Sequence, residues 1–378
     1  MAATNKPMTP GERFMKAISF ESVDRIPMMD FGYWRETIDN WHKQGLPAEV
    51  DSTEEVEAYF GLDRGFETNL VNYWADNGPV GIQWGIWPEF TKVKVGETED
   101  TIIYEGEIGR IVESKAGSIP AHEKSPVETM ADFERLVVPR MNAWDPTRVT
   151  PEFAGMLERG KAQGQAIGTW IDGFYAWPRI LMGPTNLLYT FYDDPDLLHA
   201  IQREHTNFIK NWIDMVLTYT QIDYVYFFED MAYNHGSFIS NDTFDEFLLP
   251  YYHEVVSYMR GKGIKKMLVD SDGNTVQLCD KFVEAGMDCH SPLQINSGSQ
   301  PAEIRKRHPK LALIGGIDKL TLSRTRADID KELEKIPPLL EKGGYIPALD
   351  HRVQPDVPMA NYQYYIDRKR EIMAKYCY

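Results

Sequence analysis

The second half of the chain alternates short apolar runs with longer amphipathic stretches, a pattern typical of alternating strands and helices. The apolar runs predict strands at 165–170, 224–228, 266–269, 287–290, 311–315 and 345–348. The stretches between and after them predict helices that include 195–219, 241–261, 275–285, 326–342 and 361–375. Because strands and helices alternate, we expect a parallel sheet built from right-handed βαβ units.

Nearly every predicted strand ends in a carboxylate or a histidine. These residues are Asp172, Glu229, Asp230, Asp270, Asp272, Asp318, Asp350 and His351, with Asp30 after an earlier predicted strand at 26–32. A doubly wound sheet places its ligand at one crevice, whereas a closed barrel brings all its strand ends to one rim. We therefore predict a single (β/α)8 TIM-barrel domain over residues 1–378, with the site at that rim.

The first 150 residues depart from this rhythm. Thr9 and Glu12 form a capping box around a helix that begins at Pro10, which predicts an N-terminal extension. From about 82 to 113 the apolar period changes to two, which predicts an inserted antiparallel β meander. The irregular stretch 120–150 fits either a domain boundary or an elaborated loop.

Composition narrows the class of protein. The net charge of −17 argues against nucleic-acid binding, which needs clustered Lys and Arg. No apolar run approaches the roughly 20 residues of a membrane span, and the first residues lack the apolar centre of a signal peptide. The three cysteines form neither a disulfide framework nor a CxxC pair. With so few cysteines, we expect the protein to be cytoplasmic. No dinucleotide or P-loop motif follows any strand, which argues against those two classes of nucleotide-binding protein.

Carboxylates at a barrel mouth favour acid–base or metal chemistry. Glu229, Asp230 and Asp270 are the catalytic candidates, with Glu229 as a general acid. For any one of them, a helix N-cap or a structural ion pair is the alternative. Asp270 and Asp272, with His351 and His290 from other strands, form a candidate Zn²⁺ set. His290 alone fits a buried core histidine equally well.

Aromatic residues gather near the same strand ends and suit a flat apolar substrate. We expect them to line the substrate pocket together with three strand-end carboxylates, although each alone also fits the core or a lid. The substrate-binding candidates are Asp30, Tyr33, Trp34, Trp84, Trp170, Asp172, Phe174, Trp177 and Asp318.

Several segments resemble the uroporphyrinogen decarboxylase superfamily, and within it the corrinoid-dependent methyltransferase branch. They are MTPGERFMKAI, VDRIP, IDGFYAWPRILMG, FFEDMAYNHGSFIS, FLLPYY, DSDGN, LIGGIDK and KGGYIPALDHRVQPDVPMANY. The resemblance spans nearly the whole chain and implies an enzyme with a (β/α)8 barrel. Homodimers are common in that superfamily, so a homodimer is an alternative to a monomer.

The chain departs from both branches at their functional positions. The decarboxylases carry an Arg-rich segment after the first strand, whereas no arginine precedes Arg35 here. The zinc ligands of the methyltransferases, a histidine and two cysteines, align with Asp270, Asp272 and His351. An oxygen-rich site without thiolates suits an oxygen substrate better than a thiol.

The resemblance therefore implies an O-demethylase. Such an enzyme moves a methyl group from a methyl ether, foremost a methoxylated aromatic, to the Co(I) of a separate corrinoid protein. A cofactor-independent decarboxylase acting on another substrate is the first alternative. A glycosidase that pairs Glu229 with Asp270 or Asp318 is the second. A non-catalytic binding protein is the third.

Overall fold

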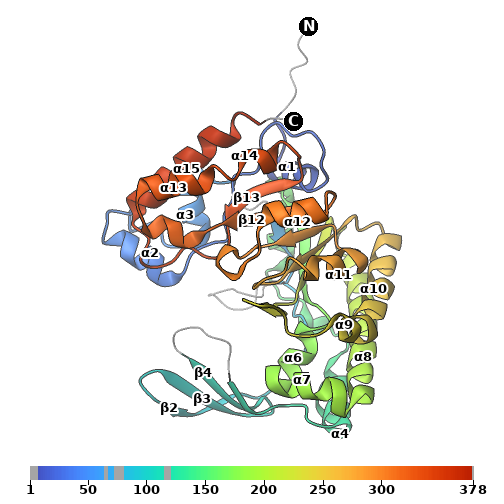
Figure 1. Ribbon diagram of the computed structural model, residues 1–378. Helices are drawn as coiled ribbons and strands as arrows, with labels where there is room; N and C mark the ends of the chain where they lie inside the picture. The colour runs from blue at the N-terminus through green and yellow to red at the C-terminus, as the bar shows by residue number, and fades with distance from the viewer. Residues whose placement is uncertain (1–6, 64–66, 72–80, 115–120, 377–378) are drawn as a thin grey trace.

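The computed structural model of the protein describes residues 7–63, 67–71, 81–114 and 121–376. At its centre is a parallel sheet of seven strands in the order β1-β6-β7-β10-β11-β12-β13 (Figure 1). The strands are β1 (Glu67–Asn69), β6 (Ala166–Asp172), β7 (Tyr224–Phe228), β10 (Lys266–Asp270), β11 (Cys289–Ser291), β12 (Ala312–Ile317) and β13 (Tyr345–Leu349). Neighbours in the sheet follow one another along the chain, without the reversal of a doubly wound sheet. The predicted TIM-barrel class is confirmed.

Segment 26–32 fills the place of the remaining strand, between the two edges of this sheet. On one side, the Met28 N–H donates to Asp63 Oδ2 and the Met28 carbonyl accepts from the Asp63 N–H, both at 2.7 Å. On the other side, the Leu349 N–H donates to Asp30 Oδ1 at 2.9 Å. The segment was predicted to be a strand, but it forms no ladder among the described residues. Two of the bonds on its two sides, those of the Met28 N–H and the Leu349 N–H, go to carboxylates and not to backbone carbonyls.

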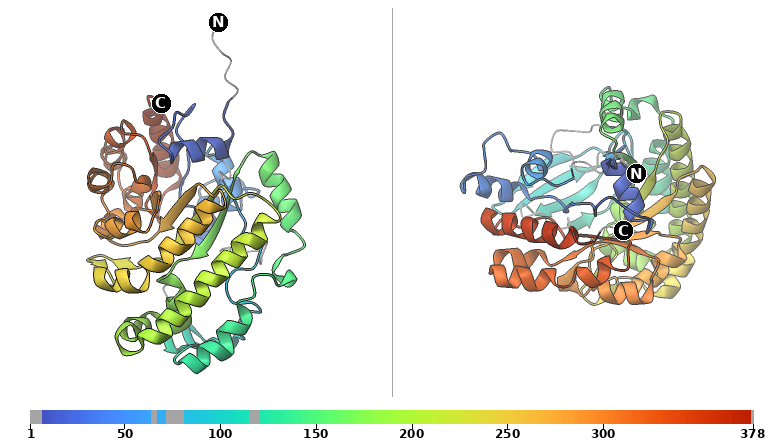
Figure 2. Two further views of the ribbon diagram at one scale, coloured as in Figure 1. Left: turned by 90° about the vertical axis from the view of Figure 1, so that its right-hand side faces the viewer. Right: turned by 90° about the horizontal axis from the view of Figure 1, so that it is seen from above.

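Helices cover the outside of the barrel, with α8 and α10 side by side along one face (Figure 2). The helices are α1 (Pro10–Ala17), α2 (Arg35–His42), α3 (Thr53–Tyr59), α4 (Met130–Asp132), α5 (Phe153–Ala162), α6 (Ala176–Met182), α7 (Pro184–Asp193), α8 (Pro195–Leu217), α9 (Asn241–Phe247), α10 (Leu249–Gly261), α11 (Leu278–Glu284), α12 (Pro301–Arg307), α13 (Arg326–Leu333), α14 (Pro337–Leu340) and α15 (Met359–Met373). None of the helices in the described ranges is long and apolar enough to cross a membrane.

Prolines divide two of the predicted helices. The predicted helix 241–261 is interrupted at Leu248, and Pro250 occupies the first turn of the second piece, where its missing N–H is tolerated. The predicted helix 326–342 likewise ends as α13, and Pro337 begins the short α14.

The predicted meander is a four-stranded antiparallel sheet that projects beside the barrel (Figure 1). Its strands are β2 (Val93–Glu97), β3 (Thr101–Gly106), β4 (Gly109–Ser114) and β5 (Ala121–Lys124). Strand β5 lies beyond the predicted end of the meander. The predicted strand near Ile82 is reduced to an isolated bridge with Val149. A small hairpin, β8 (Ala232–Tyr233) and β9 (Gly236–Ser237), follows β7 and was not predicted.

Helix α1 lies against the amino-terminal end of the barrel. The predicted capping box is present, since Thr9 and Glu12 each accept the backbone N–H of the other. The Phe14 ring packs 5.6 Å from the ring of Tyr224, the first residue of β7. The opposite end, where the strands terminate, is therefore the end available for chemistry.

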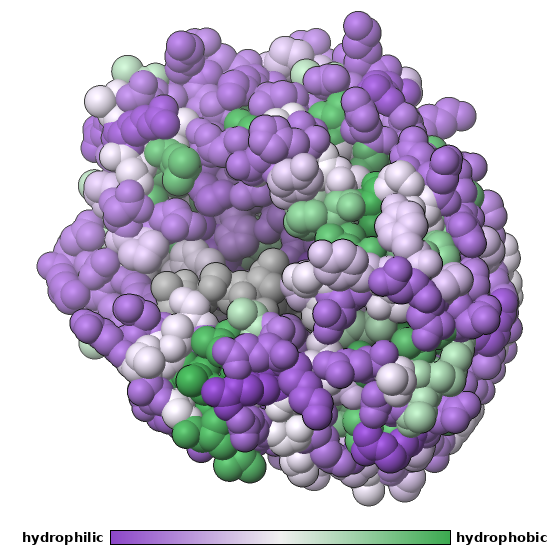
Figure 3. All heavy atoms as spheres, turned by 60° about the horizontal axis from the view of Figure 1, so that its bottom comes forward, coloured by the Kyte–Doolittle hydropathy of each residue, from purple (hydrophilic) through white to green (hydrophobic). Residues whose placement is uncertain are grey.

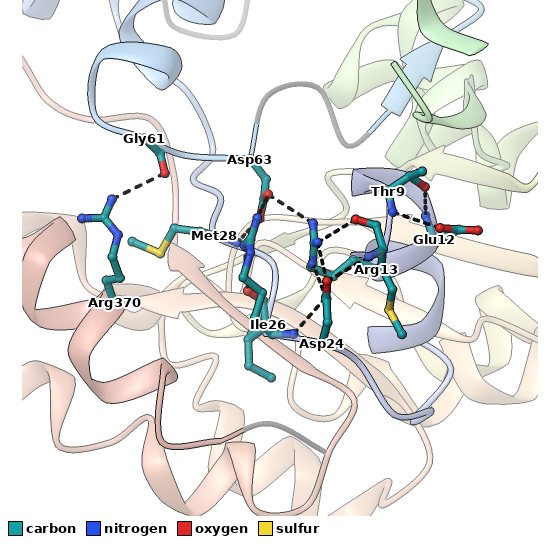
Figure 4. A network of polar contacts seen from close by, with 11 residues as sticks. Thr9, Glu12, Arg13, Asp24, Ile26, Met28, Gly61, Asp63 and Arg370 are labelled. Carbon is teal, nitrogen blue, oxygen red and sulfur yellow. Dashed lines mark hydrogen bonds and ion pairs between the residues drawn. The ribbon is translucent and has the colours of Figure 1, made fainter. Parts of the chain in front are cut away.

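A network of charged residues ties the N-terminal segment to the barrel (Figure 4). Arg13 donates to both oxygens of Asp24, at 2.7 and 2.9 Å, and to Asp63 at 3.4 Å. Asp63 also accepts from Arg25 and from the Met28 N–H. Arg13 is 4% exposed, and its hydrogen bonds lower the pKa of Asp24 to about 2.

We expect acid to weaken this network. Because its pKa is lowered in the fold, Asp24 stabilises the protein above its unfolded pKa of about 3.9 and loses that effect as the pH falls towards 2. In urea titrations, Asp24→Asn should lower the free energy of unfolding by about 1 kcal/mol at pH 7, a value reduced for partial exposure. The gap between variant and wild type should close towards pH 2. A gap that does not change with pH would contradict this role.

Candidate active site

Four residues at the carboxyl ends of adjacent strands form one layer across the sheet. The register pairs Asp172 with Phe228, Phe228 with Asp270, and Asp270 with Ser291. Side chains alternate between the two faces along a strand, so register partners point to the same face. Two residues earlier on the same strands, Trp170 pairs with Tyr226 on that face. Asp172 is treated separately because its carboxylate accepts from the Trp84 indole N–H. We call Trp170, Tyr226, Phe228, Asp270 and Ser291 the inner layer.

The inner layer faces the barrel interior, because the residues between its members face the helices. The Phe227 ring lies 5.3 Å from the ring of Tyr252 on α10. The His290 ring lies 5.5 Å from the ring of Phe282 on α11. The face that carries Asp270 is therefore the one turned away from both helices.

Aromatic and hydroxyl groups surround Asp270. The Trp170 ring stacks on Tyr226, with centroids 4.1 Å apart and an interplanar angle of 27°. The Tyr226 hydroxyl donates to Asp270 Oδ2 at 3.1 Å and also bonds to the Ser291 hydroxyl. Within the described chain, the other Asp270 oxygen, Oδ1, has no hydrogen-bond partner. An acid with one free oxygen thus lies next to a stacked pair of rings.

Burial raises the pKa of two carboxyl groups of this region. Asp270 is 6% exposed, and burial, followed by the charges of Asp272 and Asp230, raises its pKa well above the usual range. Burial and then Asp230 raise the pKa of Asp272 to about 7. The side chain of Asp272 is 32% exposed, but its Oδ1 is buried without a partner among the described residues, which agrees with this direction. The pair is therefore a source of protons.

His351 lies at the outer edge of the same region. Its Nε2 is 3.7 Å from Asp272 Oδ2, and its ring stacks against Trp34 with centroids 5.9 Å apart. Burial, with the nearby positive charges of Lys319 and Arg352, lowers the pKa of His351 to about 4. The imidazole is therefore neutral at pH 7 and forms no ion pair with Asp272. We call Asp230, Asp272, His351, Trp34 and Arg179 the rim.

Arg179 belongs to the rim but was not predicted. It lies on α6, and its Nη1 donates to the Asp230 carbonyl at 2.6 Å and to Asp230 Oδ2 at 3.2 Å. Asp230 has a φ of +46°, an unusual conformation for a non-glycine residue that often marks a functional position. The signal in the sequence that could have predicted it is a single arginine seven residues after Asp172, at the end of a strand.

Glu229 lies on the other face of the sheet, outside the barrel interior. It is fully buried, and its carboxylate accepts from the backbone N–H groups of Phe174, Tyr175 and Ala176 at 2.8–2.9 Å. The Tyr252 hydroxyl also donates to it. Burial raises the pKa of Glu229 to about 7, while these four donors act against the rise. Glu229 therefore joins β7 to the start of α6 and to α10, and does not reach the inner layer.

The residues predicted to bind zinc do not form one site. His290 faces the helices, its Nε2 bonds to the Thr275 hydroxyl at 2.8 Å, and its Nδ1 lies 3.2 Å from the Val269 carbonyl. Both ring nitrogens are therefore engaged, and the structure corrects the inclusion of His290. No group of three potential metal ligands comes together in the described ranges. Only Asp272 and His351 approach each other, so we assign no step to a metal ion.

Two predicted substrate-binding residues at the first strand lie in the core instead. Asp30 accepts from the hydroxyls of Tyr362 and Tyr365, each at 2.9 Å, and forms a buried ion pair with Lys369 at 3.1 Å. The Tyr33 hydroxyl bonds to that of Tyr362 at 2.8 Å. Asp30 anchors α15 to the barrel, so neither residue is included in the site below.

Five other candidates also hold the scaffold, namely Trp84, Asp172, Phe174, Trp177 and Asp318. Asp318 caps the 3₁₀ turn Lys319–Ser323 and accepts from Asn296 at 2.6 Å. Asp172 accepts from the Trp84 indole N–H at 2.7 Å. Phe174 and Trp177 pack in the helix layer, where the Trp177 ring stacks on His205 with centroids 4.8 Å apart.

One face of the molecule is deeply hollowed, with a hydrophilic floor and apolar side chains around it (Figure 3). A pocket of about 180 Å³ lies near the start of β13, between Phe20, Glu341 and Gly344. That pocket is at the amino-terminal end of the strands, away from the inner layer. In barrels of this kind the chemistry takes place at the carboxyl ends.

The protein is a parallel barrel with acidic and aromatic side chains at the carboxyl ends of its strands, which is the architecture of a barrel enzyme. The uroporphyrinogen decarboxylase (URO-D) family model matches residues 100–372, and the chain belongs to this family.

Individual relatives are distant. The uroporphyrinogen decarboxylase of Chloroherpeton thalassium is 28% identical over 287 residues, which cover 70% of this chain and 74% of that enzyme. The enzyme of Campylobacter fetus subsp. fetus is 27% identical over 197 residues, 49% of this chain and 52% of its own length. A methyltransferase from Methanosarcina mazei matches in structure with a TM-score of 0.60 and 14% identity, covering 96% of this chain and 99% of its own. At that identity the match shows the fold alone.

Proposed function

We propose that this protein is an O-demethylating methyltransferase that moves the methyl group of a methoxylated aromatic compound to a separate corrinoid protein. The observation that carries the proposal is a buried carboxyl group, Asp270, that accepts from the Tyr226 hydroxyl beside the stacked rings of Trp170 and Tyr226, and whose pKa burial raises. Membership of the URO-D family and a fold that one methyltransferase also has are compatible with it.

The reaction needs an acid because an aryloxide is a poor leaving group. As the C–O bond of the ether breaks, negative charge develops on oxygen, and a proton delivered there stabilises the transition state. Asp270 holds that proton, and the Tyr226 hydroxyl, which donates to Oδ2, leaves Oδ1 to face the substrate. Asp272, with its pKa near 7, supplies a second acid at the rim.

The methyl acceptor is a cobalt nucleophile, the Co(I) of a corrinoid that a partner protein brings to the barrel mouth. This chain's own contribution is to bind and orient the ether. Trp170 is the register partner of Tyr226, and Phe228 is that of Asp270, so both provide apolar surface for a ring beside the acid. The predicted homodimer stays a prediction.

A methyl-transfer screen tests this function. Purified protein is incubated with cob(I)alamin and a panel of methoxybenzenes and methoxybenzoates, and phenol formation is measured together with the loss of cob(I)alamin. We expect equal amounts of phenol formed and cob(I)alamin consumed. Release of CO2 from a carboxylated substrate without corrinoid would instead support the decarboxylase alternative.

Trp170 provides a prediction about substrate binding. Trp170→Leu removes the ring that stacks on Tyr226 and that provides apolar surface for the substrate. We expect the KM for the methoxylated substrate to rise about 10-fold, which corresponds to the free energy of one aromatic pair. The matched control is Trp177→Phe, because Trp177 stacks on His205 in the helix layer. That variant should melt at a lower temperature but keep the wild-type KM. Equal effects of both changes on KM would contradict this placement of Trp170.

A further inference from the structure

We infer that Arg179 anchors an anionic group of the substrate, which makes the substrate an aromatic methyl ether that carries a carboxylate. This inference rests on the proposed function and names the substrate class of the same site. Arg179 is a cation at a mouth otherwise rich in carboxyl groups, and its side chain is 11% exposed. A buried arginine needs partners for its N–H groups, and a carboxylate matches its planar fork.

Arg179 uses only part of its hydrogen-bonding capacity within the protein. Nη1 makes both bonds to Asp230, whereas Nε and Nη2 have no partner in the described part of the chain. The guanidinium is held over two rings, 5.9 Å from the centroid of Tyr175 and 5.6 Å from that of Phe228. These contacts fix the group in place and leave one edge of the fork for a ligand.

The position of Arg179 relative to the acid suits a single aromatic ring. Phe228, which lies under the guanidinium, is the register partner of Asp270 on the neighbouring strand, ~4.8 Å away. Arg179 is also close enough to favour the ionised form of Asp270. A ring lying along Phe228 would therefore present its ether oxygen to Asp270 and its carboxylate to Arg179.

The carboxyl groups of the region do not prevent an anion from binding. Burial favours the protonated form of Asp270 and raises the pKa of Asp272 to about 7. Asp230 is already paired with Arg179, and Lys319 lies 3.5 Å from Asp350. The mouth of the barrel therefore carries much less negative charge than its number of carboxyl groups suggests.

Equilibrium binding of two probes tests the inference without any turnover. The probes are 4-methoxybenzoate and methoxybenzene, titrated by calorimetry into the full-length protein. We expect the wild type to bind 4-methoxybenzoate more tightly. Arg179→Gln should weaken its binding about 10- to 100-fold, the range for one charged hydrogen-bonded pair, and leave methoxybenzene binding unchanged. Arg203→Gln, which alters an exposed arginine on α8, is the control and should change neither.

A second variant should strengthen binding, which a merely unfolded protein cannot do. Asp230→Asn removes the charge that competes for Arg179, and asparagine tolerates a positive φ, so 4-methoxybenzoate should bind several-fold more tightly. Equal binding of both probes with no effect of Arg179→Gln would overturn the inference and leave the proposed function standing. Failure of every methoxylated compound to bind would overturn the proposed function as well.

Discussion

Replacement of Asp270 by asparagine is expected to lower the kcat of demethylation by about 10²–10⁴-fold, the usual contribution of a general acid. Asparagine keeps the size of the side chain and can still accept from Tyr226, but it has no acidic proton. The fold should not suffer. An ionised Asp270 is unfavourable in this buried place, so the neutral variant should melt at or above the wild-type temperature at pH 8.

The role of Asp270 as a general acid also predicts how the kcat of the wild type depends on pH. The protonated form of the acid is the active one, so kcat should decline as the pH rises through the coupled titration of Asp270 and Asp272. The pKa of Asp272, about 7, places part of that decline near neutrality. The decline should be much weaker in Asp270→Asn, in which Asp272 alone of the pair still titrates. Unchanged kcat in this variant would exclude Asp270 as the acid.

Replacement of Glu229 by alanine is expected to have the largest effect on stability. The change would leave three backbone N–H groups and the Tyr252 hydroxyl buried without their acceptor, which should lower the free energy of unfolding by about 3–5 kcal/mol. Chemical denaturation monitored by tryptophan fluorescence would measure it.

Glu229→Gln separates stability from catalysis. The amide keeps one acceptor oxygen but turns an NH2 group towards backbone donors, so the variant should also be less stable than the wild type. Below its melting temperature, the folded variant should retain a kcat within a few-fold of wild type, because Glu229 does not reach the barrel interior. A stable but inactive Glu229→Gln would return Glu229 to the catalytic set.

The barrel and most of its strands were predictable from the sequence because local patterns determine them. The run 224–228 was predicted with the bounds that β7 has, and the long helix from Pro195 is present as α8. The first strand was mispredicted because its partners include carboxylates. Asp63, 35 positions along the chain, accepts from the Met28 N–H, and Asp30 of the segment itself accepts from the distant Leu349 N–H. No local pattern reveals such contacts.

The site was less predictable because it depends on which face of a strand each residue occupies. Asp270 is on the interior face with its register partner Phe228, so Glu229, the next residue, must point to the helices. The alternation of the strand contains this information, whereas the prediction of Glu229 as a general acid rested on its place at the end of an apolar strand. Arg179 was missed for another reason. Its contact with Asp230 spans 51 positions, and its role depends on a packing that the sequence does not display.

Protonation of the departing ether oxygen by Asp270 is tested most directly by a series of substrates with different leaving groups. The kcat of wild type and Asp270→Asn would be measured on aryl methyl ethers whose phenols range from strongly to weakly acidic. We predict a deficit that is large for weakly acidic phenols and nearly vanishes for a nitrophenol, whose anion departs without a proton. A deficit of the same size across the whole series would contradict the claim.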